Sequence, residues 1–468
     1  MKRRDLLKTG LIAALGVPFA TPNIASSLSK SSKKTGKVKN IIFMVSDGMS
    51  SGTLTLGNLL SQRKRRKNSN WIQLYVDNKA KRALMDTSSA NSLVTDSAAG
   101  SSSWGGGMKV NNGALNVGPK GELPVPILQK FKKAGKAVAC VTTVPITHAT
   151  PAGFCINNKS RRNQPEIAKQ YIPLKFDVMM GGGLEFFLAK TRSDGEDVFA
   201  QYEKNGWQIV KTRDEMFKVA PGKPTLGVFN ESALPYTVDQ NSDESLQKRV
   251  PTLAEMLSKS ISLMESNENG FVIQVEGGKV DWAAHSNDAP ALIYDQLAFD
   301  DAVGVAIKFA EKRDDTLVIL TTDHGNGNPG LFYGEKADSN FDKMIDIKHS
   351  NEWVFQQIAD NASADDINNL FKEHQGVELT KEQSNFIAER FKVIPNSDKS
   401  NARMLPHKEL AEFQRAHFSI HFGDLNHSAD HVELAMFGAG SEALQPFTIN
   451  TDLHNFMLEV CGLNEYKS

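Results

Sequence analysis

The chain has 468 residues, enough to bury a large core in one α/β domain with insertions or in two or three domains. Its 54 basic and 54 acidic residues balance, which argues against nucleic acid or an anionic membrane as a bulk electrostatic partner. Beyond the N-terminus no apolar run approaches the length of a membrane span, so we expect a soluble mature protein.

The N-terminus has the pattern of an export signal. Basic residues at positions 2–4 precede an apolar run too short to span a bilayer, and small residues that suit cleavage follow near Ala20 or Ala25. The adjacent arginines and the following Asp-Leu-Leu-Lys resemble a twin-arginine signal. We predict a signal peptide over 1–25, a flexible leader over 26–36, and a periplasmic or secreted protein. The alternative is an N-terminal membrane anchor.

Apolar, β-rich runs then alternate with helical patterns along the chain. Strands are predicted over 37–46, 137–144, 176–180, 225–229, 271–275, 316–322 and 432–437. Helical patterns separate many of them, for example over 124–134 and 250–265. This alternation predicts an α/β fold, a doubly wound and mostly parallel sheet flanked by helices.

Two segments have the character of insertions. The basic run at 63–67 is most simply a solvated loop, although it could attract anionic substrates. The stretch 331–425 lacks clusters of metal-ligand type but holds two capping-box patterns, at Ser363–Asp366 and Thr380–Gln383. We interpret it as a partly helical, crown-like subdomain that shapes access or an interface.

Chemically versatile residues follow the predicted strand ends. Asp47, Glu276 and Asp323 each come directly after or at the end of a buried run. His148 follows the strand at 137–144 in the same way. Ligands of parallel sheets collect beyond the carboxyl ends of the strands, so we expect these side chains to meet at one edge.

The turn after the strand at 271–275 carries Asp281 and His285 four positions apart. On a helix this spacing places both side chains on one face, and a carboxylate with an imidazole suits zinc. The same stretch is also compatible with an ordinary helix N-terminus after a glycine turn. Within the segment 95–107, Ser97 begins a run of small residues that could start a helix, where free N–H groups favour an alkoxide and a phosphate.

Three cysteines, Cys140, Cys155 and Cys461, do not form a disulfide framework. Cys140 falls in a predicted buried strand, where a free thiol usually acts as a small hydrophobe. A bond between Cys140 and Cys155 stays open as an alternative.

Several of these segments, taken in order, resemble the alkaline phosphatase family over about residues 38–440, which makes 37–465 the expected catalytic domain. The segments are Asp47-Gly-Met49, Thr95-Asp-Ser97, His148-Ala-Thr150, Glu276-Gly-Gly with Asp281 and His285, Thr322-Asp-His324, and His427. The resemblance implies a phosphate monoester hydrolase with two Zn²⁺ ions and one Mg²⁺ ion.

The resemblance also implies roles for individual residues. Ser97 is the expected nucleophile, which forms a phosphoserine intermediate, and Arg161 is the expected phosphate clamp. The implied ligands are Asp281, His285 and His427 for one zinc, Asp47, Asp323 and His324 with Ser97 for the second, and Asp47, Thr150 and Glu276 for magnesium. This chemistry is sound on general grounds, because zinc stabilises a serine alkoxide and a guanidinium matches phosphoryl oxygens.

Some of these assignments have competitors in the sequence. His421 and His431 lie near His427, and Arg162 adjoins Arg161. We favour His427 from its spacing to Gly438.

The third site has two alternative readings. The family varies at the positions of His148 and Trp282, so His148 could be a ligand that recruits a softer metal or a residue that supports the ligands. Trp282 is expected beside the site, and Asp96 is expected to orient Arg161.

The favoured function has alternatives as well. A phosphodiesterase or sulfatase of the same metal superfamily is the nearest, and a non-catalytic phosphate- or metal-binding export protein is a second. Small phosphomonoesters are the expected substrates, and a homodimer is possible because family members are often dimeric.

Overall fold

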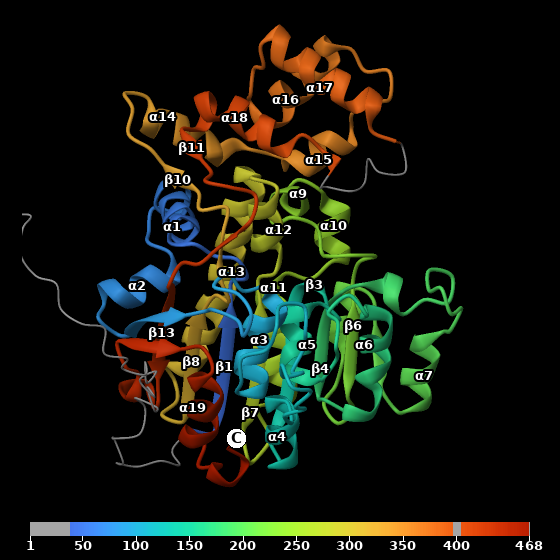
Figure 1. Cartoon of the computed structure of the whole chain (residues 1–468), viewed down its shortest axis with the longest axis vertical. Helices are drawn as coiled ribbons and strands as arrows, with labels where there is room; N and C mark the ends of the chain where they lie inside the picture. Colours follow the sequence, from blue (N-terminus) through green and yellow to red (C-terminus); the bar gives the residue numbers. More distant parts are fainter. Residues whose placement is uncertain (1–37, 396–403, 468) are drawn as a thin grey trace, which may run out of the picture.

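A ten-stranded sheet runs through the molecule, and helices cover both of its faces (Figure 1). The computed structural model describes residues 38–395 and 404–467, so the predicted signal peptide and leader lie outside the described residues. Across the sheet the strands are β14 (Phe447–Ile449), β2 (Lys81–Asp86), β13 (Val432–Gly438), β8 (Thr316–Thr321), β1 (Asn40–Val45), β7 (Phe271–Glu276), β3 (Ala137–Pro145), β4 (Val178–Gly182), β6 (Thr225–Val228) and β5 (Gln208–Val210).

The strands are parallel except that β13 runs antiparallel to both of its neighbours, β8 and β2. In the central register Val45 of β1 lies opposite Glu276 of β7 and Thr321 of β8. The carboxyl ends of these three strands are therefore level, and the residues that follow them emerge at one edge of the sheet.

Each face of the sheet has its own hydrophobic core. Phe43 and Val45 of β1 point into one core, while Ile42 and Met44 point into the other, as expected of a strand that is buried on both sides. The first core is covered by α3 (Ser97–Gly106), α4 (Ile127–Lys133), α5 (Ala149–Cys155), α6 (Gln164–Gln170), α7 (Val198–Lys204) and α19 (Asp452–Val460). The second is covered chiefly by α2 (Asn70–Val76), α8 (Arg213–Lys218), α11 (Leu253–Met264) and α13 (Ala289–Ala310).

The predicted fold class is confirmed, and all seven predicted strands are present. The edge strands β5 and β14, and β2 next to β14, were not predicted. Among the described residues, no helix combines the length and the apolar character that crossing a bilayer requires.

A helical subdomain, formed by the described residues 331–395 and 404–425, lies beyond the carboxyl ends of the strands (Figure 1). It contains α14 (Ala337–Asp342), α15 (Asn351–Gln356), α16 (Ala364–Gln375), α17 (Lys381–Val393) and α18 (His407–Phe418). Both predicted capping boxes are present, Ser363 with Asp366 and Thr380 with Gln383. A third apolar core, which includes Phe355, fills the space between these helices.

Two short antiparallel strand pairs connect the subdomain to the edge of the sheet. β9 (Gly325–Asn326) pairs with β12 (His427–Ser428), and β10 (Gly330–Leu331) pairs with β11 (Ile420–His421). The basic run ends α1 (Ser51–Arg65) and also contacts the subdomain, because Arg63 lies 3.1 Å from both Asp338 and Asp342. Residues 63–65 of the run are therefore helical and Arg63 is paired, while Arg66 and Lys67 follow the end of the helix.

Candidate active site

Ser97 is the first residue of α3, and its side chain is 1% exposed. Asp96 caps this helix, since its Oδ1 accepts a hydrogen bond from the main-chain N–H of Ala99 at 3.0 Å. The Ser97 Oγ atom lies 3.3 Å from Nε2 of His324. The serine hydroxyl therefore lies both at the positive end of a helix dipole and beside a buried imidazole.

A first group of candidate metal ligands contains Asp281, His285 and His427. Asp281 and His285 lie on α12 (Lys279–His285), as the spacing predicted, and Oδ2 of Asp281 is 3.4 Å from Nε2 of His285. His427 comes from β12, and its Nε2 lies 3.6 Å from Oδ1 of Asp281 and 3.0 Å from Nε2 of His285. Three side chains from two distant segments thus converge on one point.

A second group contains Asp47, Asp323 and His324, all fully buried. Nε2 of His324 lies 3.2 Å from Oδ2 of Asp323 and 3.6 Å from Oδ1 of Asp47. The imidazole of His324 also stacks on that of His427, with ring centroids 3.6 Å apart. The first and second groups are therefore in direct contact, as two neighbouring ions require.

A third group contains Asp47, Thr150, Glu276 and His148. Thr150 Oγ1 donates to Oδ2 of Asp47 at 3.2 Å, and Nδ1 of His148 lies 4.0 Å from Oε1 of Glu276. His148 is thus close enough to be a ligand. Trp282, the other position where the family varies, packs edge-on against the His148 ring at a centroid distance of 6.2 Å.

Arg161 reaches this cluster from the loop after α5. Its Nη1 donates to Oδ2 of Asp96 at 3.0 Å, and its Nη2 donates to Nε2 of His148 at 3.0 Å. Arg162 is exposed, and its main-chain N–H donates to the Oγ of Ser160. The structure therefore brings Arg161, and not Arg162, to the side of Asp96 and His148.

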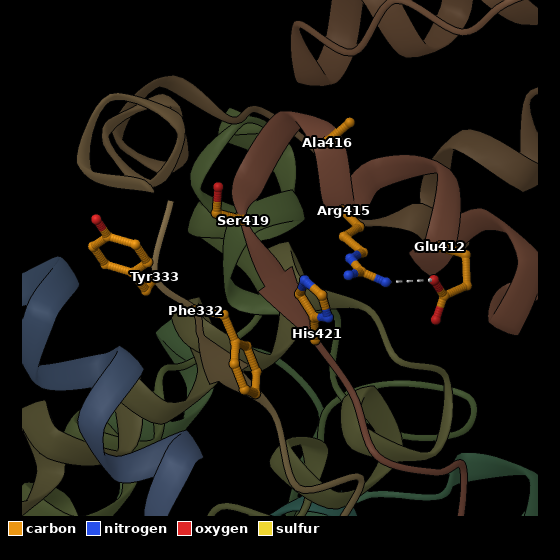
Figure 2. A pocket seen from close by; sticks show the side chains of 7 residues that line it. All are labelled: Phe332, Tyr333, Glu412, Arg415, Ala416, Ser419 and His421. Atoms are coloured by element: carbon orange, nitrogen blue, oxygen red, sulfur yellow. Dashed lines mark ion pairs between the residues drawn. The ribbon is translucent and has the colours of Figure 1, made fainter. Parts of the chain in front are cut away.

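The two competing histidines lie elsewhere. His421 lines a surface cavity of about 260 Å³ on the helical subdomain. Figure 2 shows it beside Phe332 and Arg415. His431 packs edge-on against Phe447 at a centroid distance of 5.0 Å. Only His427 of the three joins the cluster of candidate ligands in the part of the chain that the structure describes.

The buried oxygen and nitrogen atoms of these groups have the chemistry of metal ligands. Within residues 38–395 and 404–467, Oδ1 of Asp47, Oε1 of Glu276 and Nδ1 of His148 have no hydrogen-bond partner. Burial, and then the charge of Asp323, raises the pKa of Asp47, and burial raises the pKa of Glu276 to about 7. Several buried carboxylates in contact destabilise the folded state unless positive charge compensates their repulsion. Divalent ions would supply that charge.

The His148 ring is neutral, because burial and then the neighbouring Arg161 charge lower its pKa to about 3. A neutral imidazole has one lone pair, and in His148 it lies on Nε2 and accepts from Arg161, so Nδ1 carries the proton. His148 is available as a metal ligand only when Arg161 releases Nε2 and the proton can leave Nδ1. Its Nε2 accepts from Arg161, and its Nδ1 faces Glu276.

Three further residues support the site: Thr142 and Asn326 were not predicted from the sequence, and Gly48 was indicated only as part of Asp47-Gly-Met49. Thr142 donates a short hydrogen bond to Glu276, and Asn326 donates to Oδ1 of Asp281 at 2.7 Å. Gly48 has a φ of +67°, and a Cβ there would lie 2.5 Å from Oδ1 of Asp281, so this turn requires glycine. Asn326 follows Asp323-His324-Gly325 directly, which is the one signal that could have indicated it.

Comparisons with known proteins agree with this geometry. Residues 38–463 match the family model described as alkaline phosphatase. The chain is 26% identical over 452 residues to alkaline phosphatase 4 of Bacillus subtilis, which covers 94% of this chain and 93% of that protein. It is 31% identical over 388 residues to the repressible alkaline phosphatase of Saccharomyces cerevisiae, and the match covers 75% of this chain and 66% of that protein. The crystal structure of Thermus thermophilus alkaline phosphatase has a TM-score of 0.84 at 29% identity and 92% coverage of both chains.

Proposed function

This chain belongs to the alkaline phosphatase family, and we propose that Ser97 and the three ligand groups around it form the active centre. Enzymes of this family hydrolyse phosphate monoesters in a metal-dependent reaction that passes through a phosphoserine. The observation that carries the proposal is the buried Ser97 hydroxyl at the start of α3, within 3.3 Å of His324.

The proposed roles follow from what each side chain contacts. Ser97 attacks the phosphorus atom and becomes phosphorylated, and the N-terminal N–H groups of α3 favour the negative phosphoryl oxygens beside it. Arg161 would hold two of those oxygens with its planar guanidinium, as a bidentate donor. Asp96 positions Arg161 through its 3.0 Å hydrogen bond. It also caps α3, the helix that begins with Ser97, by accepting from the main-chain N–H of Ala99.

The metal assignment is part of the proposal. Asp281, His285 and His427 would hold one zinc ion, and Asp47, Asp323 and His324 would hold a second next to Ser97. Asp47, Thr150 and Glu276 would hold magnesium, with His148 as the donor that could admit a softer ion. When bound, the ions would favour the Ser97 alkoxide, neutralise the leaving oxygen and supply hydroxide to open the phosphoserine.

Turnover of a nitrophenyl monophosphate and of the matching bis-ester tests the proposed activity. We expect the monoester to be preferred by a wide margin, because its phosphoryl group offers three unesterified oxygens to Arg161 and the bound ions, whereas the bis-ester offers only two. A preference for the diester would favour the phosphodiesterase alternative and contradict the proposal.

Export and assembly are also proposals. Residues 1–25 would direct the folded chain out of the cytoplasm, and the mature protein would form a homodimer. Replacing Arg3 and Arg4 with lysine should keep the protein inside the cell, which fractionation measures. Light scattering of the mature protein should give twice the mass of one chain, and a monomer mass would contradict the dimer.

A further inference from the structure

Two of the three cysteines meet in the core that supports the active site. Sγ of Cys140, in β3, lies 3.6 Å from Sγ of Cys155, the last residue of α5, and both side chains are fully buried. Cys461 follows α19 and is half-buried. All three thiols are free in the structure.

The pair is placed for a bond that the structure does not yet contain. Disulfide sulfurs are about 2.0 Å apart, so the two Sγ atoms, now 3.6 Å apart, must approach by roughly 1.6 Å to form the bond. Cys140 and Cys155 are 15 positions apart in the chain, and the loop they would close contains His148 and Thr150. A crosslink here would tie the third ligand group to the central sheet.

We propose that Cys140 and Cys155 form an intramolecular disulfide when the chain meets a small disulfide oxidant such as oxidised glutathione. One cysteine thiolate attacks a sulfur of the oxidant and releases a first glutathione thiolate. The second cysteine thiolate then attacks the mixed disulfide and releases the other. Both cysteines are oxidised, one oxidised glutathione becomes two reduced molecules, and the two cysteine protons end on the released thiolates.

The bond would also act on the nucleophile helix, because α5 packs closely against α3. A Cβ at Gly105 of α3 would lie 1.8 Å from the carbonyl oxygen of Gly153, and a Cβ at Gly153 would lie 2.0 Å from Oγ of Ser101. The two helices therefore touch backbone to backbone at their glycines. Fixing the end of α5 to β3 would hold α3, and with it Ser97, against the same sheet.

The experiment uses the full mature chain, as wild type and as Cys461→Ser. Each is incubated with oxidised glutathione, once folded and once during refolding from urea, because burial slows access to the pair. After denaturation and alkylation, free thiols should fall from three to one in the wild type, and from two to none in Cys461→Ser. Peptide mapping should join Cys140 to Cys155. The Tm of the oxidised form should rise by about 4 °C over the reduced form.

Single variants Cys140→Ser and Cys155→Ser supply the matched controls and should show no change in Tm with oxidant. If either fails to fold, the Cys461→Ser arm still reports on the pair alone. Three free thiols in the wild type under both treatments would overturn the proposal. A mixed disulfide at Cys461 as the sole product would do the same. Each readout is independent of catalysis, so the outcome does not depend on the proposed active centre.

Discussion

The Nε2 atoms of His285 and His427 face each other at 3.0 Å, although the Nδ1 atom of each ring already has another hydrogen-bond partner. Nδ1 of His285 lies 2.7 Å from the Leu425 carbonyl oxygen, and Nδ1 of His427 lies 2.9 Å from the Thr95 carbonyl oxygen. A carbonyl oxygen can only accept, so both Nδ1 atoms carry protons. In neutral rings both Nε2 atoms then present lone pairs to the same point, which a shared cation makes favourable.

This relationship predicts the effect of replacing His427. The variant His427→Ala should lose about one metal ion per chain, because a ligand has gone from the group with Asp281 and His285. His431→Ala is the matched control, since His431 packs on Phe447 away from the cluster, and it should keep its full metal content. Metal analysis after dialysis checks both. Equal metal loss in the two variants would contradict the assignment of His427.

Replacing Ser97 with alanine should reduce monoesterase turnover by about three orders of magnitude or more while the ions stay bound. The physical reason is that the carboxylates and imidazoles remain but no oxygen is left to accept the phosphoryl group. Ser103→Ala is a control in the same helix, where the hydroxyl donates to the Ala99 carbonyl oxygen away from the site. Steady-state kinetics measure both, and full activity in Ser97→Ala would refute the assigned nucleophile.

Arg161→Ala should lower kcat/KM about 10–100-fold, the usual cost of a lost charge-assisted hydrogen bond. Arg161→Lys should recover only part of this, because an ammonium cannot make the planar two-point contact. Arg162→Ala should leave kcat/KM unchanged, as Arg162 is exposed. The assignment fails if Arg162→Ala is the variant that loses activity.

Acid should weaken the helical subdomain through His407, which begins α18. Burial lowers its pKa from 6.5 to about 4, and neither ring nitrogen has a hydrogen-bond partner among the residues described. Between these values the unfolded chain binds a proton that the folded chain does not, so stability falls as pH falls through this window. The free energy of unfolding should drop by about 2 kcal/mol between pH 7.5 and pH 5 from this residue.

His407→Leu should remove that part of the pH dependence, because leucine has no proton to bind. Urea unfolding of both proteins at the two pH values, followed by circular dichroism, gives the comparison. An equal loss of stability in wild type and variant would show that His407 does not titrate in this window.

The sequence predicted the central strands because they are buried on both faces. Ile42 and Phe43 of β1 face different cores, so the run is apolar throughout and easy to recognise. Strand β2, between β14 and β13, reads Lys-Arg-Ala-Leu-Met-Asp, with Ala83 and Met85 buried and Leu84 exposed, so it lacks such a run. The antiparallel direction of β13 could not be predicted from the sequence either, because a buried strand has the same apolar pattern in either direction.

At the site, the sequence indicated the functional residues better than it indicated the contacts between them. Asp281 and His285 are four positions apart on a helix, and that local spacing was enough to predict their proximity. The contact between Arg161 and His148 depends on an irregular loop that has no periodic signal. Cys140 and Cys155 could not be paired from the sequence either, because the packing of α5 on β3 sets their distance.

The most direct test is metal analysis of the purified mature protein together with monoesterase assay before and after chelation. We expect two zinc ions and one magnesium ion per chain, loss of turnover when the ions are removed, and recovery when zinc and magnesium are restored. A metal-free protein that retained full turnover of the monoester would contradict it.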